Sequence, residues 1–180
     1  MRTLICMLCI ALSIHGVAQQ SSNMKQIDNT PVTGFELDRY LGTWYEIARF
    51  PHTFEKNLTG VSATYSLKKN GKIEVLNAGY KESLNGPFSQ ARGKAKAAGD
   101  PDVGHLKVSF FLFFYADYYI MELDKENYQW ALVGSDSPNY LWLLSRTPSI
   151  PDSLYDDLTN RALKRGYSLE KLSRVPQHVD

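Results

Sequence analysis

Between about residues 42 and 147, short stretches of alternating apolar and polar side chains are separated by turn residues. In 61–68 every odd position is apolar, and in 106–110 every even position is apolar. A period of two is typical of strands that bury one face. Asn70-Gly71, between two lysines, predicts a tight hairpin turn. The pattern therefore predicts strands at 43–50, 59–69, 72–80, 88–98, 104–112, 117–124, 128–135 and 139–146.

Eight antiparallel strands of this spacing are compatible with an up-and-down β-barrel. Closing such a sheet leaves no free edge and encloses room for one small ligand. A β-sandwich fits the same spacing, so the strand pattern alone leaves both architectures open. After Pro148 the period changes: Leu154, Leu158 and Ala162 recur at helical spacing, which predicts one C-terminal helix over 151–165.

The N-terminus has the features of a secretory signal peptide. Arg2 precedes an apolar stretch from Leu4 to Ile14, and Gly16-Val17-Ala18 provides the small residues of a cleavage site. The polar residues that follow predict a flexible lead into a single domain. The predicted division is a signal peptide over 1–18, a flexible N-terminal segment over 19–34 and one domain over 35–175.

Cysteine usage and net charge exclude several classes of function. Both cysteines, Cys6 and Cys9, lie within the predicted signal, so the mature chain would have no disulfide and no reactive thiol. The whole chain has 20 basic and 19 acidic residues, and removing the signal takes away Arg2 and no acidic residue. Because the mature charge is then balanced, we expect no nucleic-acid partner.

Two tryptophan motifs stand at opposite ends of the predicted strand region. One is Gly42-Thr43-Trp44-Tyr45, and the other is Tyr140-Leu141-Trp142-Leu143-Leu144-Ser145-Arg146. Together they resemble the lipocalin family, and within it the bacterial lipocalins of the apolipoprotein D-like group. The resemblance implies the all-β, eight-stranded antiparallel barrel, with one C-terminal α-helix packed outside, rather than the sandwich. It also implies that Arg146 packs over Trp44 as a structural closure of the narrow end, with Gly42 shaping the start of the first strand.

Alternation within a barrel also predicts which side chains face the interior. An inward Arg146 implies that Trp142 and Tyr140 face inward too, while an outward Glu122 implies an inward Met121 and Tyr119. Continuing the alternation from Met121 and Tyr119 toward lower residue numbers places Tyr115 inward as well. The resemblance implies an aromatic pair at the ligand that corresponds to Tyr115 and Trp142. The predicted ligand-binding residues are Ala63, Tyr65, Val75, Asn77, Ala95, Val108, Phe110, Tyr115, Tyr119, Met121, Tyr140 and Trp142.

The strand over 88–98 carries small residues on its predicted inner face. Its basic residues must face water, which leaves Gly93, Ala95 and Ala97 inside. Small side chains on an inner wall leave volume unfilled, whereas a packed core favours larger ones. We therefore expect a cavity for one elongated apolar ligand. The alternative is a filled core without a pocket.

These observations predict a non-enzymatic carrier that binds, stores or transports fatty acids, lysophospholipids or similar lipids in the cell envelope. The sequence lacks a Gly-x-Ser-x-Gly elbow, a phosphate-binding loop and a metal-binding histidine motif, so we expect no cofactor and no metal. Two alternatives stay open. One is an enzyme that acts on a lipid substrate inside the same cavity, and the other is a protein-interaction barrel with an occluded core.

Partners and localisation follow from two further segments. The run Phe110–Tyr115 is aromatic or apolar throughout, so we expect either transient membrane contact through Phe111–Tyr115 or packing over the barrel mouth. Many bacterial relatives are lipoproteins anchored through a cysteine that follows a small residue, but here Cys9 follows Leu8. We therefore expect an exported, soluble protein, periplasmic or secreted, that is a monomer or a dimer.

Overall fold

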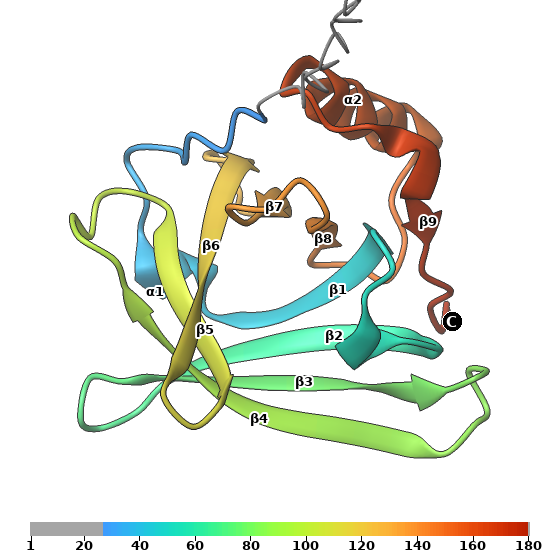
Figure 1. Ribbon diagram of the computed structural model, residues 1–180, viewed down its shortest axis with the longest axis horizontal. Helices are drawn as coiled ribbons and strands as arrows, with labels where there is room; N and C mark the ends of the chain where they lie inside the picture. The colour runs from blue at the N-terminus through green and yellow to red at the C-terminus, as the bar shows by residue number, and fades with distance from the viewer. Residues whose placement is uncertain (1–26, 180) are drawn as a thin grey trace, which may run out of the picture.

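The computed structural model describes residues 27–179, which form a closed antiparallel β-barrel with a helix against its outside (Figure 1). Neighbours in the chain are neighbours in the sheet from β2 to β8, and β1 pairs with both β8 and β2 to close it. The predicted eight-stranded up-and-down barrel is therefore confirmed. Its strands are β1 (Gly42–Arg49), β2 (Leu58–Leu67), β3 (Ile73–Lys81), β4 (Phe88–Ala97), β5 (His105–Phe111), β6 (Phe114–Leu123), β7 (Trp130–Gly134) and β8 (Leu141–Ser145).

Short elements complete the barrel at both ends. The helix α1 (Leu37–Tyr40) precedes β1, and the 3-10 turn η1 (Thr53–Glu55) lies between β1 and β2. A second 3-10 turn, η2 (Leu169–Lys171), leads to β9 (Ser173–Arg174), which pairs with β1 and which the sequence pattern did not predict. No helix among residues 27–179 is long and apolar enough to cross a membrane.

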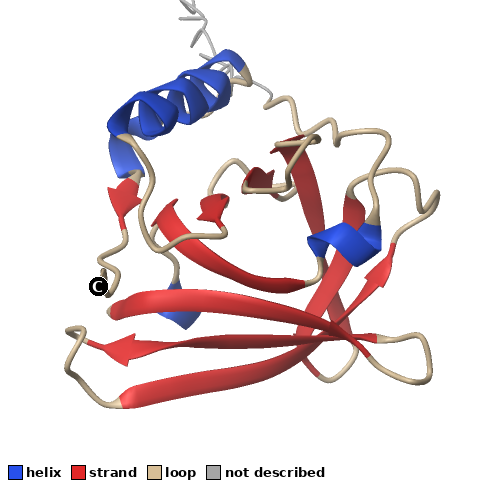
Figure 2. Ribbon diagram, turned by 180° about the vertical axis from the view of Figure 1, so that it is seen from behind, coloured by secondary structure: helices blue, strands red, loops and turns tan. Residues whose placement is uncertain are grey.

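The C-terminal helix α2 (Asp152–Lys164) covers part of the outer barrel wall (Figures 1 and 2). Leu141 and Leu143 of β8 point outward, as predicted, and pack in one cluster with Leu158 and Ala162 of the helix. Burying these aliphatic side chains removes apolar surface from water, which favours docking of the helix. The expected position of the helix, 151–165, agrees with the observed one to within one residue at each end.

One irregularity in β6 changes which side chains reach the interior. The register of β6 against β7 shifts between Ile120 and Glu122, so Met121 is an extra residue. Ile120 belongs to the interior cluster, whereas Met121 packs in the cluster beneath α2. A bulge of this kind places two successive residues on one face of a strand, here Met121 and Glu122, because Glu122 also faces α2 and accepts hydrogen bonds from Arg161 and Arg165. The inward orientation predicted for Met121 and Tyr119 is therefore wrong, because strict alternation was extended through a bulge.

The chain makes contacts on both sides of the predicted domain limits. Residues 1–26, which include the predicted signal peptide and half of the predicted flexible segment, lie outside the described residues. Within the described part, Val32 N–H donates to the Ile120 carbonyl, and Gly104 N–H donates to that of Val32. Gln177 donates to the carbonyls of Glu46 and Val61 at the other end. The packed unit is therefore longer than 35–175.

Candidate ligand cavity

One end of the barrel is closed by a cation stacked on an indole ring. The Arg146 guanidinium carbon lies 3.8 Å from the Trp44 ring centre, and Trp44 is fully buried. Gly42 has a φ of +95°, and a Cβ there would lie 3.3 Å from Arg146 Nη1. Glycine is therefore required both for the backbone angle and for the space. The guanidinium donates to the carbonyls of Arg39, Leu41, Thr43 and Tyr128, so four of its N–H groups are bonded to the backbone at this end.

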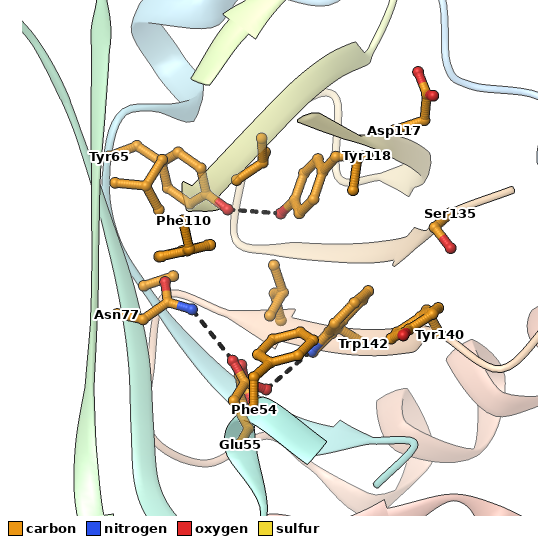
Figure 3. A pocket seen from close by; sticks show the side chains of 16 residues that line it. Phe54, Glu55, Tyr65, Asn77, Phe110, Asp117, Tyr118, Ser135, Tyr140 and Trp142 are labelled. Atoms are coloured by element: carbon orange, nitrogen blue, oxygen red, sulfur yellow. Dashed lines mark hydrogen bonds between the residues drawn. The ribbon is translucent and has the colours of Figure 1, made fainter. Parts of the chain in front are cut away.

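Further along the barrel interior lies a cavity of about 230 Å³ with a mostly apolar lining (Figure 3). Eight of the predicted ligand-binding residues line it, namely Ala63, Tyr65, Val75, Asn77, Val108, Phe110, Tyr140 and Trp142. The other residues that line it are Glu46, Phe54, Glu55, Ala116, Asp117, Tyr118, Ser135 and Leu144. Trp142 and Tyr140 stack with ring centres 5.9 Å apart, which gives the cavity an aromatic wall on β8.

Three predicted residues of β6 do not line the cavity. Tyr119 stacks on His105 outside it and donates from its hydroxyl to Asp136. Tyr115 lies next to the ammonium groups of Lys94 and Lys96 on the outer surface. Met121 accepts a hydrogen bond from Tyr167, which follows α2. Tyr118 and Ala116, the alternate set on the same strand, face the cavity in their place.

The small residues of β4 do not create the cavity. A Cβ at Gly93 would lie 2.8 Å from the Phe110 ring, so Phe110 occupies the space above this glycine. Ala95 is buried in the interior cluster, and Ala97, which pairs with Leu106 across the strands, is exposed. Neither Ala95 nor Ala97 lines the cavity. The prediction of a cavity from the small side chains of β4 fails here because Phe110 on the neighbouring β5 fills the space beside Gly93.

A hydrogen-bonded group of tyrosines forms the inner end of the cavity. The Tyr65 hydroxyl donates to that of Tyr118 at 3.0 Å, and the Tyr118 and Tyr40 hydroxyls lie 2.8 Å apart. Burial raises the pKa of all three side chains well above the usual range of tyrosine. These phenols therefore stay neutral, and they provide polar contacts at the end of an otherwise apolar space.

Charged residues on β1 and η1 form the opposite side of the cavity, and the sequence reasoning missed them. Glu46 and Glu55 are 3% and 4% exposed. Arg49 Nη1 donates to Glu46 Oε2 at 2.8 Å. Asn77 donates to one oxygen of Glu55 at 3.2 Å, and the Trp142 indole N–H donates to the other at 3.5 Å (Figure 3).

The protonation of Glu46 is shifted by this environment. Its pKa lies well above the usual glutamate value, first because the side chain is buried and then because the Glu55 carboxylate is adjacent, with Arg49 partly offsetting both. Alternation from the inward Trp44 would have placed Glu46 inside, so this residue had a signal in the sequence. Glu55 had none, because it lies on a 3-10 turn where no period of two applies.

Comparisons with known proteins agree with this architecture. Residues 35–177 match the family model of the lipocalin-like domain. The chain is 41% identical over 177 residues to a Vibrio cholerae protein named outer membrane lipoprotein Blc, an alignment that covers 98% of this chain and 99% of the relative. It is 36% identical over 168 residues to mouse apolipoprotein D, covering 88% and 86%.

Solved structures of low sequence identity share the fold. Insecticyanin from the tobacco hornworm Manduca sexta superposes with a TM-score of 0.67 at 18% identity, covering 84% of this chain and 85% of insecticyanin. Barrel order, the Trp44–Arg146 closure and the matched domain all lead to one assignment. The chain belongs to the lipocalin family.

Proposed function

We propose that this protein is a carrier that encloses one apolar or amphipathic molecule, such as a fatty acid, a lysophospholipid or a similar lipid. The observation that supports this most is the mostly apolar cavity, closed at one end, with Trp142 in its wall. At about 230 Å³ the cavity is smaller than the ~300–1,000 Å³ of typical ligand pockets. A long chain would therefore be enclosed in part and extend through the mouth.

Burial of the acyl chain provides the binding energy in this proposal. Each buried methylene contributes ~0.8 kcal/mol, so about ten would contribute ~8 kcal/mol before costs. Association and ordering reduce that gross value. A micromolar dissociation constant, which corresponds to about −8.2 kcal/mol, is therefore the upper range of affinity that we expect.

Fluorescence quenching tests the proposal directly. A fatty alcohol brominated along its chain should quench the wild-type protein, and Trp142→Phe should abolish most of that quenching. The matched control is Trp130→Phe, because Trp130 packs beneath α2 and does not line the cavity. Undiminished quenching in Trp142→Phe would mean that the ligand binds elsewhere. Product formation from an unmodified lipid during the same incubation would contradict a carrier and favour an enzyme.

We also propose that the β5–β6 turn contacts a lipid bilayer while ligand is exchanged. Phe113 and Phe114 are 85% and 75% exposed, and Phe111 and Leu112 are also exposed. Exposed apolar patches of this kind mark interaction sites in soluble domains. Lys94 lies within 5.7 Å of the Phe113 ring centre, which places a positive charge beside the apolar tip. An apolar tip with flanking lysine matches the interface of an anionic membrane.

Export to the cell envelope is part of the same proposal. It rests on the predicted signal over 1–18 and on relatives whose name is outer membrane lipoprotein. Expression of the full chain in a bacterium, followed by mass measurement of the periplasmic extract, tests it. We expect a species that begins at Gln19. A lipid-modified species that retains Cys9 would contradict cleavage after Ala18.

A further inference from the structure

The charged side of the cavity presents hydrogen-bond acceptors to the interior and keeps its positive charge behind the wall. Glu46, Glu55 and Asn77, here called the acceptor cluster, all line the cavity. Arg49 does not line it. Its Nη1 donates to Glu46, and its Nη2 donates to the carbonyls of Glu55 and Leu58, each at 2.9 Å. An entering ligand therefore meets the carboxyl groups rather than the guanidinium.

One acceptor of this cluster is buried without a partner. Asn77 Oδ1 has no hydrogen-bond partner among the described residues, while Asn77 Nδ2 donates to Glu55 Oε1 at 3.2 Å. Because an ionised carboxylate only accepts hydrogen bonds, this contact fixes the amide with its nitrogen toward Glu55 and leaves its oxygen free. A buried acceptor without a donor is unfavourable, and a donor supplied by a ligand would satisfy it.

A ligand carboxylate would meet the opposite situation. Glu46 and Glu55 are both buried beside each other, and this burial and the adjacent Glu55 raise the pKa of Glu46, so a further negative charge here would be unfavourable. His52 Nε2 lies 2.9 Å from Glu55 Oε2, yet neither ring nitrogen makes a hydrogen bond within the described part of the chain. Asp117, which also lines the cavity, is held by Lys107 and His105. A third carboxylate would therefore lack a free cation in the cavity wall.

We propose that Glu46, Glu55 and Asn77 form a polar subsite that accepts hydrogen bonds from the hydroxyl or protonated amine head of an otherwise apolar ligand and disfavours a carboxylate head. The tail would lie along the apolar lining, which includes Ala63, Val75 and Val108. Its end would point toward the Tyr65–Tyr118 pair, which Figure 3 shows on the opposite side of the cavity from Glu55. This subsite rests on the carrier function proposed above and specifies the ligand class.

Three ligands with the same chain test the subsite: dodecanol, dodecylamine and dodecanoate. Each is titrated by calorimetry below its micelle threshold at pH 8. We expect dodecanol and dodecylamine to bind about tenfold more tightly than dodecanoate, because each donates to the cluster. Equal affinities, or tighter dodecanoate, would overturn the subsite and leave the carrier function intact. Failure of all three chains to bind would overturn the carrier function itself.

Variants separate the cluster from general charge effects. In Glu46→Gln/Glu55→Gln, dodecanoate should bind about tenfold more tightly and dodecylamine about tenfold more weakly. Glu74→Gln is the control for the loss of a negative charge elsewhere, because Glu74 lies on β3 and pairs with Lys68 and Arg92 away from the cavity. Asn77→Leu removes the free acceptor with a single substitution, and it should weaken the binding of dodecanol about fivefold. Unchanged affinities in a folded variant of either kind would contradict the proposal.

Discussion

The two ends of this barrel each combine an arginine with a tryptophan, and they use the pair differently. At the closed end, Arg146 stacks on Trp44 and donates four hydrogen bonds to backbone carbonyls. At the open end, Arg49 lies behind the wall, and Trp142 faces the cavity beside Glu55. Hydrogen bonds between protein groups stabilise the fold at the closed end. At the open end, Asn77 Oδ1 has no hydrogen-bond partner among the described residues and is available to a ligand.

Breaking the closed end should have the largest effect. Arg146→Met removes the hydrogen bonds to four backbone carbonyls, which are part-buried or exposed, and the cation above Trp44. We therefore expect the free energy of unfolding to fall by about 2 kcal/mol. Urea denaturation measures this loss. Arg92→Met is the control, because its exposed ion pair with Glu74 should contribute less than about 0.5 kcal/mol. A loss for Arg146→Met as small as that of the control would remove the structural role from the closure.

A change at the open end should affect membrane contact without affecting stability. Phe113→Ser with Phe114→Ser removes two exposed rings, so binding to vesicles of mixed phosphatidylcholine and phosphatidylglycerol should weaken about tenfold or more. Co-sedimentation measures the bound fraction. Leu163→Ser, an exposed apolar residue on α2, should bind like the wild type. If both variants sediment alike, the β5–β6 turn is not the contact.

The open end should also make stability depend on pH. The pKa of Glu46 is raised in the folded state, mainly by burial and by Glu55, so folding is favoured while Glu46 is protonated. This contribution is complete below the unfolded pKa near 4.5 and is lost as the pH rises through the folded value. Glu46→Gln cannot ionise. From pH 5 to pH 8 the wild type should therefore lose stability relative to Glu46→Gln, on the order of 1 kcal/mol.

Urea midpoints at pH 5, 6.5 and 8 measure that difference. Glu74→Gln provides the comparison, because a hydrogen bond from Lys68 lowers the pKa of Glu74 and keeps it ionised throughout this range. The stability difference between wild type and Glu74→Gln should accordingly stay constant. A constant difference for Glu46→Gln as well would show that Glu46 is ionised at pH 5.

The smallest effect should distinguish two adjacent tyrosines. Tyr118→Phe removes a hydroxyl at the inner end of the cavity, whereas Tyr119→Phe removes one outside it that bonds Asp136. We expect the affinity for dodecanol to fall about threefold in Tyr118→Phe and to stay unchanged in Tyr119→Phe. A loss in Tyr119→Phe alone would mean that Tyr119, rather than Tyr118, faces the cavity.

Inward and outward side chains were predicted correctly on the regular strand β8 and incorrectly for residues of β6, which contains a bulge. On β8, unbroken alternation correctly separated Trp142 and Tyr140 inside from Leu141 and Leu143 beneath α2. On β6, a single extra residue at Met121 reversed the assignment of Tyr119 and Tyr115, which lie outside the cavity. Bulges have no strong residue signature, so an alternation pattern cannot locate them.

The acceptor cluster shows the same limit on β1. A register shift between Glu46 and Ala48 places Ile47 and Ala48 together under α2 and returns Arg49 toward Glu46. Strict alternation from the inward Trp44 places Arg49 on the outer face, so the sequence pattern does not predict its contact with Glu46. The lining of the cavity by Glu55 depends further on how η1 folds back toward Asn77.

The sequence by itself determined the strands and their order, because alternation and turn residues are local signals. The two tryptophan motifs predicted the barrel and its closed end through their resemblance to the lipocalins. Only the tertiary structure decided the shape of the cavity and its chemistry. Phe110 fills the space above Gly93, and Glu46, Glu55 and Asn77 meet from three separate segments. Such meetings depend on bulges and on the packing of neighbouring strands, which are set by the closed barrel as a whole.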